Sequence, residues 1–193
     1  DDPMMYAQAV KSVSVPTQSI LFNIDIEGPL TKDKTAVLRV FAKMFYNHCG
    51  FYGDDLKIAK LERFIEKQGT TQQFREAFEK VNGAPWTETR DSFAFFEDDI
   101  VSVLQSTLGM SEQAARNWFN GEETNELSIA QLVADIQEYV DGKGKDFRLL
   151  FMVDEVGQYI GDDGDLMINL QSLVEEIGIR CHGKVWVMVT SQE

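Results

Sequence analysis

Three short apolar runs recur along the 193-residue chain, and stretches with helical periodicity separate them. The runs are "SILFNID" at residues 19–25, "LLFMV" at 149–153 and "VWVMVT" at 185–190. Continuous apolar runs of this length are typical of strands buried in a parallel sheet, whose crossover connections are usually helices. The order of elements therefore predicts an α/β fold with three parallel strands and with helices on both faces of the sheet.

The region between the first and second strands is long and carries only helical patterns. Its apolar residues recur at three- and four-residue spacing, without a strand-like run. Phenylalanines such as Phe74 and Phe78 follow this spacing, which is typical of core packing rather than of an aromatic ligand site. We predict a sheet-bearing core formed by residues 1–53 and 121–193, and a helical insertion at 54–120.

Capping residues indicate where several helices begin. Ser128 starts a capping box with Gln131, ahead of an apolar helical face. Asp91 and Asp165 each precede a helical pattern and are candidate N-caps. Gly178 follows the apolar face that begins after Asp165, and we expect that helix to stop there.

The charge and the apolar content exclude several classes of partner. Thirty-two acidic residues against 18 basic ones give a net charge of -14, which disfavours direct binding to a nucleic-acid backbone or to an anionic membrane surface. The apolar runs are far shorter than the roughly 20 residues of a membrane span, and no basic-then-apolar signal pattern opens the chain. We expect a soluble, cytoplasmic protein that contacts no membrane.

Two adjacent carboxylates, Asp154 and Glu155, follow the second apolar run directly. Ligands of open parallel sheets bind beyond the carboxyl ends of the strands, which is where this pair is expected. Mg²⁺ prefers oxygen ligands and keeps much of its water, so Asp154 is a candidate for water-mediated magnesium binding. Glu155 is a candidate for orienting the water that attacks a γ-phosphate. Thr190 ends the third run, Gln192 lies two residues further on, and both are candidates for sensing that phosphate. In the alternative, structural interpretation, Asp154 caps a turn and Glu155 is solvated.

Two segments of the chain resemble a known protein family. They are "DDPMMYAQAVKSVSVPTQSILFNID" at the start and "LLFMVDEVGQYIGDDGDLMINLQSLVEEIGIRCHGKVWVMVTSQE" at residues 149–193. Together they resemble the large P-loop ATPase subunit of the BREX phage-resistance system, a family of AAA+ type ATPases. The resemblance is most specific in "VDEVGQYIGD" and "VWVMVTSQE".

The resemblance implies a fold, a site and a biological setting. The fold is a partial P-loop NTPase of the AAA+ type, with three layers and an inserted helical subdomain. Asp154 and Glu155 correspond to the Walker B pair, and the "TSQ" segment holds the sensor 1 position, as either Gln192 or Thr190. The implied cofactors of the full-length protein are ATP and Mg²⁺, and the implied partners are the other subunits of the defence complex.

One motif of the family is missing from this sequence. The family has a glycine-rich Walker A loop, G-x-x-x-x-G-K-[S/T], and no segment of that form occurs here. We therefore expect a fragment that neither binds nor hydrolyses ATP by itself. In this ATPase class the sheet order is 5-1-4-3-2, so the strand at 149–153 is expected in the middle. The strand at 185–190 is then an exposed edge, and we expect self-association through it.

The sequence leaves two main functional hypotheses. In the first, the chain is part of an ATP-hydrolysing subunit of a bacterial antiphage complex. In the second, it is a non-catalytic interaction module whose helical region at 54–120 mediates complex assembly. An unrelated doubly wound domain is a third option.

Overall fold

The computed structural model describes residues 3–29, 31–120 and 127–191, and it divides into two compact units. One unit contains Asp1–Met44 and Leu127–Glu193, and we call it the sheet unit. The other, Phe45–Glu126, is the helical unit. The sequence-based division placed the ends of the insertion at residues 54 and 120.

The sheet unit is built on three parallel strands, β1 (Thr17–Asn23), β2 (Arg148–Asp154) and β3 (Val185–Val189). Their order is β1-β2-β3, so the strand predicted to lie in the middle does so. Asn23 pairs with Asp154 at the end of β1, and Val153 pairs with Val189. The chain is thus rich in helix around a small parallel sheet, as the α/β prediction requires.

One face of this sheet carries the core of the unit. Alternate strand residues such as Phe22 and Phe151 are buried, because successive side chains of a strand point to opposite faces. Phe41, on a covering helix, packs edge-on against Phe22 and lies 5.3 Å from Phe151, measured between ring centroids. The helices of this part of the chain are α1 (Pro3–Val13), α2 (Ile24–Glu27), α3 (Ala36–His48), α9 (Ile129–Gly142), α10 (Val156–Ile160) and α11 (Gly164–Arg180).

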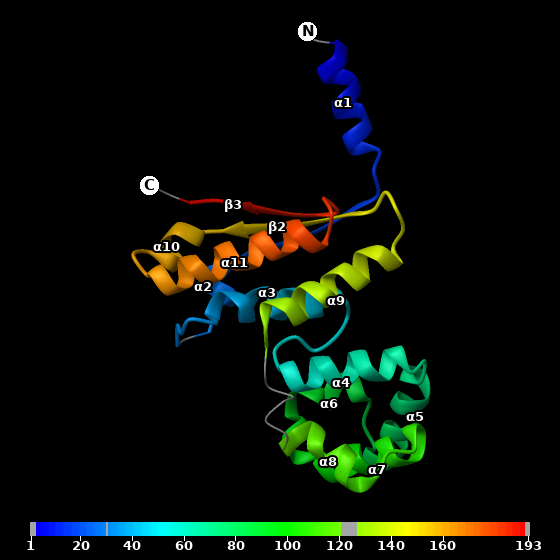
Figure 1. Ribbon diagram of the computed structural model, residues 1–193. Coiled ribbons are helices and arrows are strands. Elements are labelled where there is room, and N and C mark those ends of the chain that lie inside the picture. The colour runs from blue at the N-terminus through cyan, green and yellow to red at the C-terminus, as the bar shows by residue number, and fades with distance from the viewer. Residues whose placement is uncertain (1–2, 30, 121–126, 192–193) are drawn as a thin grey trace. The chain divides into compact units, whose positions relative to one another are not determined.

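Among the described residues, helices cover only this one face, so the prediction of two covered faces was wrong. Figure 1 shows α3, α9 and α11 on the same side of the strands. On the opposite side Leu21, Trp186 and Met188 remain 69%, 59% and 52% exposed. Both crossovers, β1 to β2 and β2 to β3, advance in the same direction across the sheet. Right-handed connections that advance in one direction place their helices on one face.

The helical unit has an aromatic core of its own. Trp86 lies edge-on to both Phe74 and Phe78, with ring centroids 5.3 and 5.1 Å away, and all three are buried. Core packing of these residues is therefore confirmed. The helices of the unit are α4 (Leu56–Lys67), α5 (Thr71–Asn82), α6 (Trp86–Thr89), the 3-10 helix η1 (Arg90–Phe95), α7 (Glu97–Leu108) and α8 (Glu112–Asn120).

Of the predicted helix starts, one is confirmed and two are wrong. The hydroxyl of Ser128 accepts a hydrogen bond from the backbone N–H of Gln131 at 3.1 Å, so Ser128 is the N-cap, while the Gln131 amide donates to Asp135 at 2.9 Å. Asp163, and not Asp165, caps α11, and this helix continues past Gly178. Asp91 does not start a helix of α type, because η1 intervenes and α7 begins six residues later.

No helix within the described part of the chain is long and apolar enough to cross a membrane.

Candidate functional site

The carboxyl ends of the three strands bring Asn23, Asp154 and Thr190 into one row. Asn23 and Asp154 are direct partners in the register of β1 and β2. Thr190 follows β3, and its backbone N–H donates to the carbonyl of Val153 at 2.9 Å. Because the strands are parallel, residues that are far apart in the sequence meet at this edge, where open sheets bind their ligands.

The carboxylate of Asp154 is held by two donors. The hydroxyl of Thr190 donates to Oδ1 of Asp154, and the backbone N–H of Glu155 donates to the same oxygen at 3.0 Å. Asp154 nevertheless stays exposed to solvent. An oriented carboxylate with a free face and a neighbouring hydroxyl is a donor set that suits a hydrated Mg²⁺ ion.

The carboxylate of Glu155 points back across the edge of the sheet to Asn23. Nδ2 of Asn23 donates to Oε2 of Glu155 at 2.6 Å. The backbone of Glu155 adopts the left-handed region, with φ of 60°, and so the chain turns sharply between β2 and α10. This turn separates the directions of the two neighbouring side chains, so that Asp154 contacts β3 and Glu155 contacts β1.

Asn23 is the member of this site that sequence reasoning missed. The predicted strand ran to Asp25, which is wrong because the side chain of Asn23 ends β1 by capping α2. Oδ1 of Asn23 accepts from the backbone N–H groups of Asp25 and Ile26, at 2.9 and 3.2 Å. With Oδ1 committed to this cap, the Nδ2 group is directed toward Glu155. An asparagine that interrupts an apolar run was the available signal, since asparagine is a preferred N-cap.

A close backbone approach joins the turn after β2 to the segment after β3. The backbone N–H of Val156 donates to the carbonyl of Thr190 at 3.1 Å. A Cβ atom at Gly157 would lie 2.0 Å from Oγ and 3.0 Å from Cβ of Ser191, so a larger residue would force the Ser191 side chain to move. The glycine therefore leaves room for Ser191 beside the turn.

Beside this row, α2 and α10 pack through Tyr159. Its phenol is buried, and burial, followed by the charge of Asp25, raises its pKa above the ordinary value. Nζ of Lys32 lies 4.0 Å from the centre of the ring and donates to the carbonyl of Tyr159 at 3.1 Å. A Cβ atom at Gly28 would lie within 3 Å of the phenol. Tyr159 thus fixes α10 against the loop that follows α2.

Of the predicted site residues, Asp154, Glu155 and Thr190 come together, while Gln192 lies outside the described residues. In the ranges that the structure describes, no group of three or more His, Cys, Asp or Glu side chains is placed to hold a metal ion.

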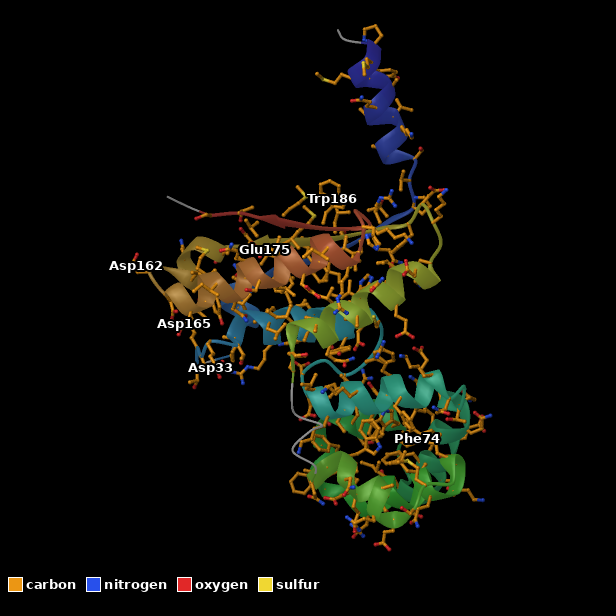
Figure 2. The ribbon with its side chains drawn as sticks, in the orientation of Figure 1. Asp33, Phe74, Asp162, Asp165, Glu175 and Trp186 are labelled. Atoms are coloured by element: carbon orange, nitrogen blue, oxygen red, sulfur yellow. The ribbon has the colours of Figure 1, made fainter. Side chains whose placement is uncertain are left out.

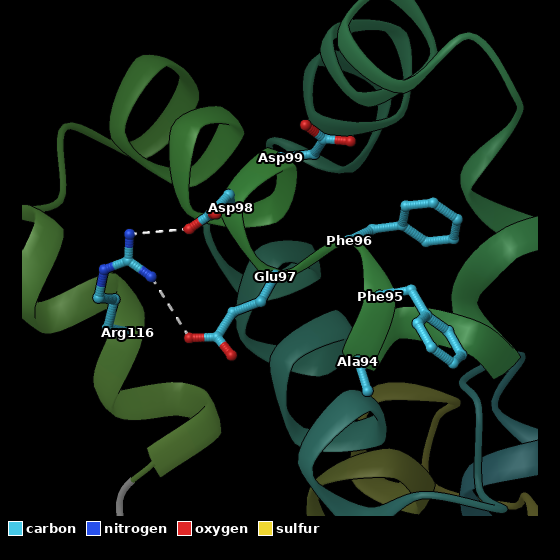
Figure 3. A pocket seen from close by; sticks show the side chains of 7 residues that line it. All are labelled: Ala94, Phe95, Phe96, Glu97, Asp98, Asp99 and Arg116. Carbon is cyan, nitrogen blue, oxygen red and sulfur yellow. Dashed lines mark hydrogen bonds and ion pairs between the residues drawn. The ribbon is translucent and has the colours of Figure 1, made fainter.

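A pocket of about 480 Å³ lies elsewhere, in the helical unit (Figure 3). Its charged residues are Glu97, Asp98, Asp99 and Arg116. Arg116 donates to the carboxylates of Asp98 at 2.9 Å and Glu97 at 3.5 Å, and its hydrogen bond to Asp98 is the main cause of its raised pKa. With its cation already paired and its remaining charges acidic, the pocket is unsuited to a phosphate-bearing ligand.

No protein-family model matches the chain, and no solved structure is significantly similar to it.

Proposed function

We propose that the chain carries the Walker B and sensor 1 segments of a P-loop ATPase of the AAA+ type. In the full-length protein, these segments belong to an ATP-hydrolysing subunit of a bacterial antiphage complex of the BREX kind. The observation that carries the proposal is the hydrogen-bonded row at the edge of the sheet, in which Thr190 holds Asp154 and Asn23 holds Glu155.

The hydrogen bonds of this row support different roles for the carboxylates of Asp154 and Glu155. Asp154 is exposed and oriented by Thr190, which suits the positioning of a hydrated magnesium ion. Such an ion, bound to the phosphates of ATP, would neutralise the negative charge that develops on the transferred phosphoryl group. Glu155 diverges from Asp154 through its left-handed backbone and is available to accept a proton from a water molecule.

Asn23 gives Glu155 a resting position. While Nδ2 of Asn23 remains 2.6 Å from Oε2, this oxygen is occupied and is not free to contact an attacking water molecule. We propose that Glu155 positions the water only when this contact opens.

The test uses the full-length protein and three variants. Glu155→Gln is expected to abolish phosphate release while ATP binding persists, and Asp154→Asn is expected to lower hydrolysis and to raise the magnesium concentration that it requires. Glu175→Gln is the matched control, because Glu175 is an exposed glutamate on α11 (Figure 2). Unchanged phosphate release by Glu155→Gln would refute the proposal.

The alternative function, an interaction module, has one specific observation in its favour. Phe95, in the lining of the pocket of the helical unit, is 87% exposed, although large aromatic side chains are usually buried. A partner protein that covers this ring would explain its exposure. If Phe95→Ser abolishes co-purification with the other subunits while Glu155→Gln leaves both assembly and phosphate release intact, the module function is the correct one.

A further inference from the structure

The hydroxyl of Tyr159 is buried without a hydrogen-bond partner, and only 2% of this residue is exposed. Within the described residues, it is the only buried side-chain nitrogen or oxygen atom in this condition. Such groups are rare in native proteins, because a buried hydroxyl without a partner has lost the hydrogen bonds that it forms with water. The conformation that buries the phenol is therefore less stable than the same packing would be without the hydroxyl.

The phenol of Tyr159 connects two short helices. It lies on α10 and packs on Gly28, which ends α2. A Cβ atom at Gly28 would lie 2.8 Å from Cε2 of the ring and 2.9 Å from its hydroxyl oxygen, so the absence of a side chain at this position leaves room for the phenol. The two helices are in contact at the carboxyl edge of the sheet (Figure 1).

The same two helices are joined a second time, at their starts, by the candidate site. Asn23 caps α2 and Glu155 directly precedes α10, and Nδ2 of Asn23 donates to Oε2 of Glu155 at 2.6 Å. The backbone N–H of Tyr159 donates to the carbonyl of Glu155 at 3.1 Å, so one helical turn separates the phenol from the carboxylate. With four residues in α2 and five in α10, each helix is little more than one turn long, and a displacement at one end moves the other.

We propose that Tyr159 is a positioning residue for Glu155, and that its buried hydroxyl makes the Asn23–Glu155 contact easier to open. This inference rests on the proposed function, in which Glu155 acts after that contact opens. While the phenol packs on Gly28, α2 and α10 stay together and Asn23 reaches Glu155. When the helices separate, the hydroxyl gains hydrogen bonds to water and Glu155 is released. The unsatisfied hydroxyl therefore shifts the equilibrium toward separation, by roughly tenfold.

Tyr159→Phe tests this role, because it removes the hydroxyl and keeps the ring. In the full-length protein, we expect phosphate release to fall by roughly tenfold while ATP binding is unchanged, since the contact opens less often. Tyr139→Phe is the matched control, because the hydroxyl of Tyr139 already donates to Gln18 at 2.7 Å. Its rate of phosphate release is expected to stay unchanged. A rate for Tyr159→Phe that equals or exceeds that of the unchanged protein would overturn the proposal.

A second background separates positioning from a merely structural role of the ring. Asn23→Ser removes the contact to Glu155, so Tyr159→Phe is expected to have no further effect on phosphate release in that background. An equal fall in both backgrounds would show that the hydroxyl does not act through the Asn23–Glu155 contact, and the proposal would be wrong.

Amide hydrogen exchange in the 193-residue chain measures the opening itself, without any hydrolysis. In Tyr159→Phe, exchange of the α10 amides is expected to slow by roughly tenfold, whereas Tyr139→Phe leaves it unchanged. Equal exchange in the two variants would overturn the coupling of α2 and α10, whatever the full-length protein hydrolyses. If exchange slows as expected but Glu155→Gln leaves phosphate release intact, the coupling is supported and the proposed ATPase function is the part that fails.

Discussion

Nδ2 of Asn23 lies 2.6 Å from Oε2 of Glu155 and connects the ends of two neighbouring strands through a side-chain hydrogen bond. The same asparagine caps α2 with its other amide atom. One residue thus combines a structural contact with a contact to the candidate general base, and substitutions at this position can separate the two.

Asn23→Ser is expected to keep the helix cap and to lose the amide that reaches Glu155. Serine is a good N-cap but its side chain is too short to bridge the strands. Without this donor, both carboxylate oxygens of Glu155 are free to contact the attacking water, so ATP hydrolysis by the full-length protein is expected to rise. Asn23→Ala removes the cap as well and is expected to lower the stability of the isolated chain by about 1 kcal/mol. Phosphate release and thermal unfolding measure the two effects, and an unchanged hydrolysis rate for Asn23→Ser would contradict this role.

Thr190→Val removes the hydroxyl that donates to Asp154 while keeping the shape of the side chain. Loss of a hydrogen bond to a charged group corresponds to roughly a tenfold change in an equilibrium or a rate. We expect hydrolysis by the full-length protein to fall by about this factor, with a higher magnesium requirement. Thr190→Ser keeps the hydroxyl and is the control. Identical magnesium titrations for the two variants would rule out a positioning role for Thr190.

Glu62→Leu is expected to destabilise the helical unit strongly. The buried carboxylate of Glu62 accepts from the indole of Trp86 at 2.7 Å and from Arg90 at 2.9 Å. Removing one partner of a buried ion pair costs about 3 kcal/mol, because the remaining groups lose their acceptor. Glu66→Leu, on the exposed side of the same helix, is the control and is expected to stay within about 0.5 kcal/mol of the unchanged protein. Chemical denaturation followed by tryptophan fluorescence measures both variants.

The Cys181 thiol is expected to make unfolding depend on pH in the alkaline range. Burial raises its pKa from 9.0 to about 11. Because the folded-state pKa is the higher one, the stabilisation is complete below pH 9 and is lost as the pH rises toward about 11. The melting temperature is expected to fall as the pH rises from 9 toward about 11, and Cys181→Ala is expected to reduce this fall. At pH 8, alkylation of Cys181 is expected to be slower than that of the less buried Cys49. Equal alkylation rates would show that Cys181 is accessible.

The strand β3 is expected to promote self-association, because it lies at the edge of the described sheet and is uniformly apolar. Val189→Lys places a charge on this edge and is expected to shift sedimentation toward the monomer. The substitution Val174→Lys, at a partly exposed position on α11, controls for the added charge alone. A chain that sediments as a monomer before any substitution would exclude this association.

Local sequence patterns predicted the strands and helices. The contacts within the candidate site depend on residues that are far apart in the sequence. The apolar run before Asp154 and the N-cap at Ser128 are local signals, and both corresponded to the structure. The position of Asn23 beside Glu155 depends on pairing between strands that are more than 120 residues apart in sequence, which no local pattern reports.

Two other differences also have physical causes. The segment that contains Asp163 and Asp165 offers several carboxylates as caps, and only the backbone conformation at residue 163 selects among them. The coverage of the sheet depends on the direction in which successive strands are added, which is a property of the whole topology. The predicted strand order, combined with the right-handed crossover rule, already implies that one face stays bare, and the prediction of two covered faces did not apply that rule.

The backbone of Glu155 has a further consequence. In the left-handed region a residue with a Cβ atom is less stable than glycine by roughly 1 kcal/mol. If the sequence were chosen for thermal stability alone, glycine would occupy this position. With glutamate at this position the protein is less stable than it would be with glycine, but it keeps a carboxylate at the edge of the sheet. Variant libraries sorted for stability and for activity should therefore diverge at position 155.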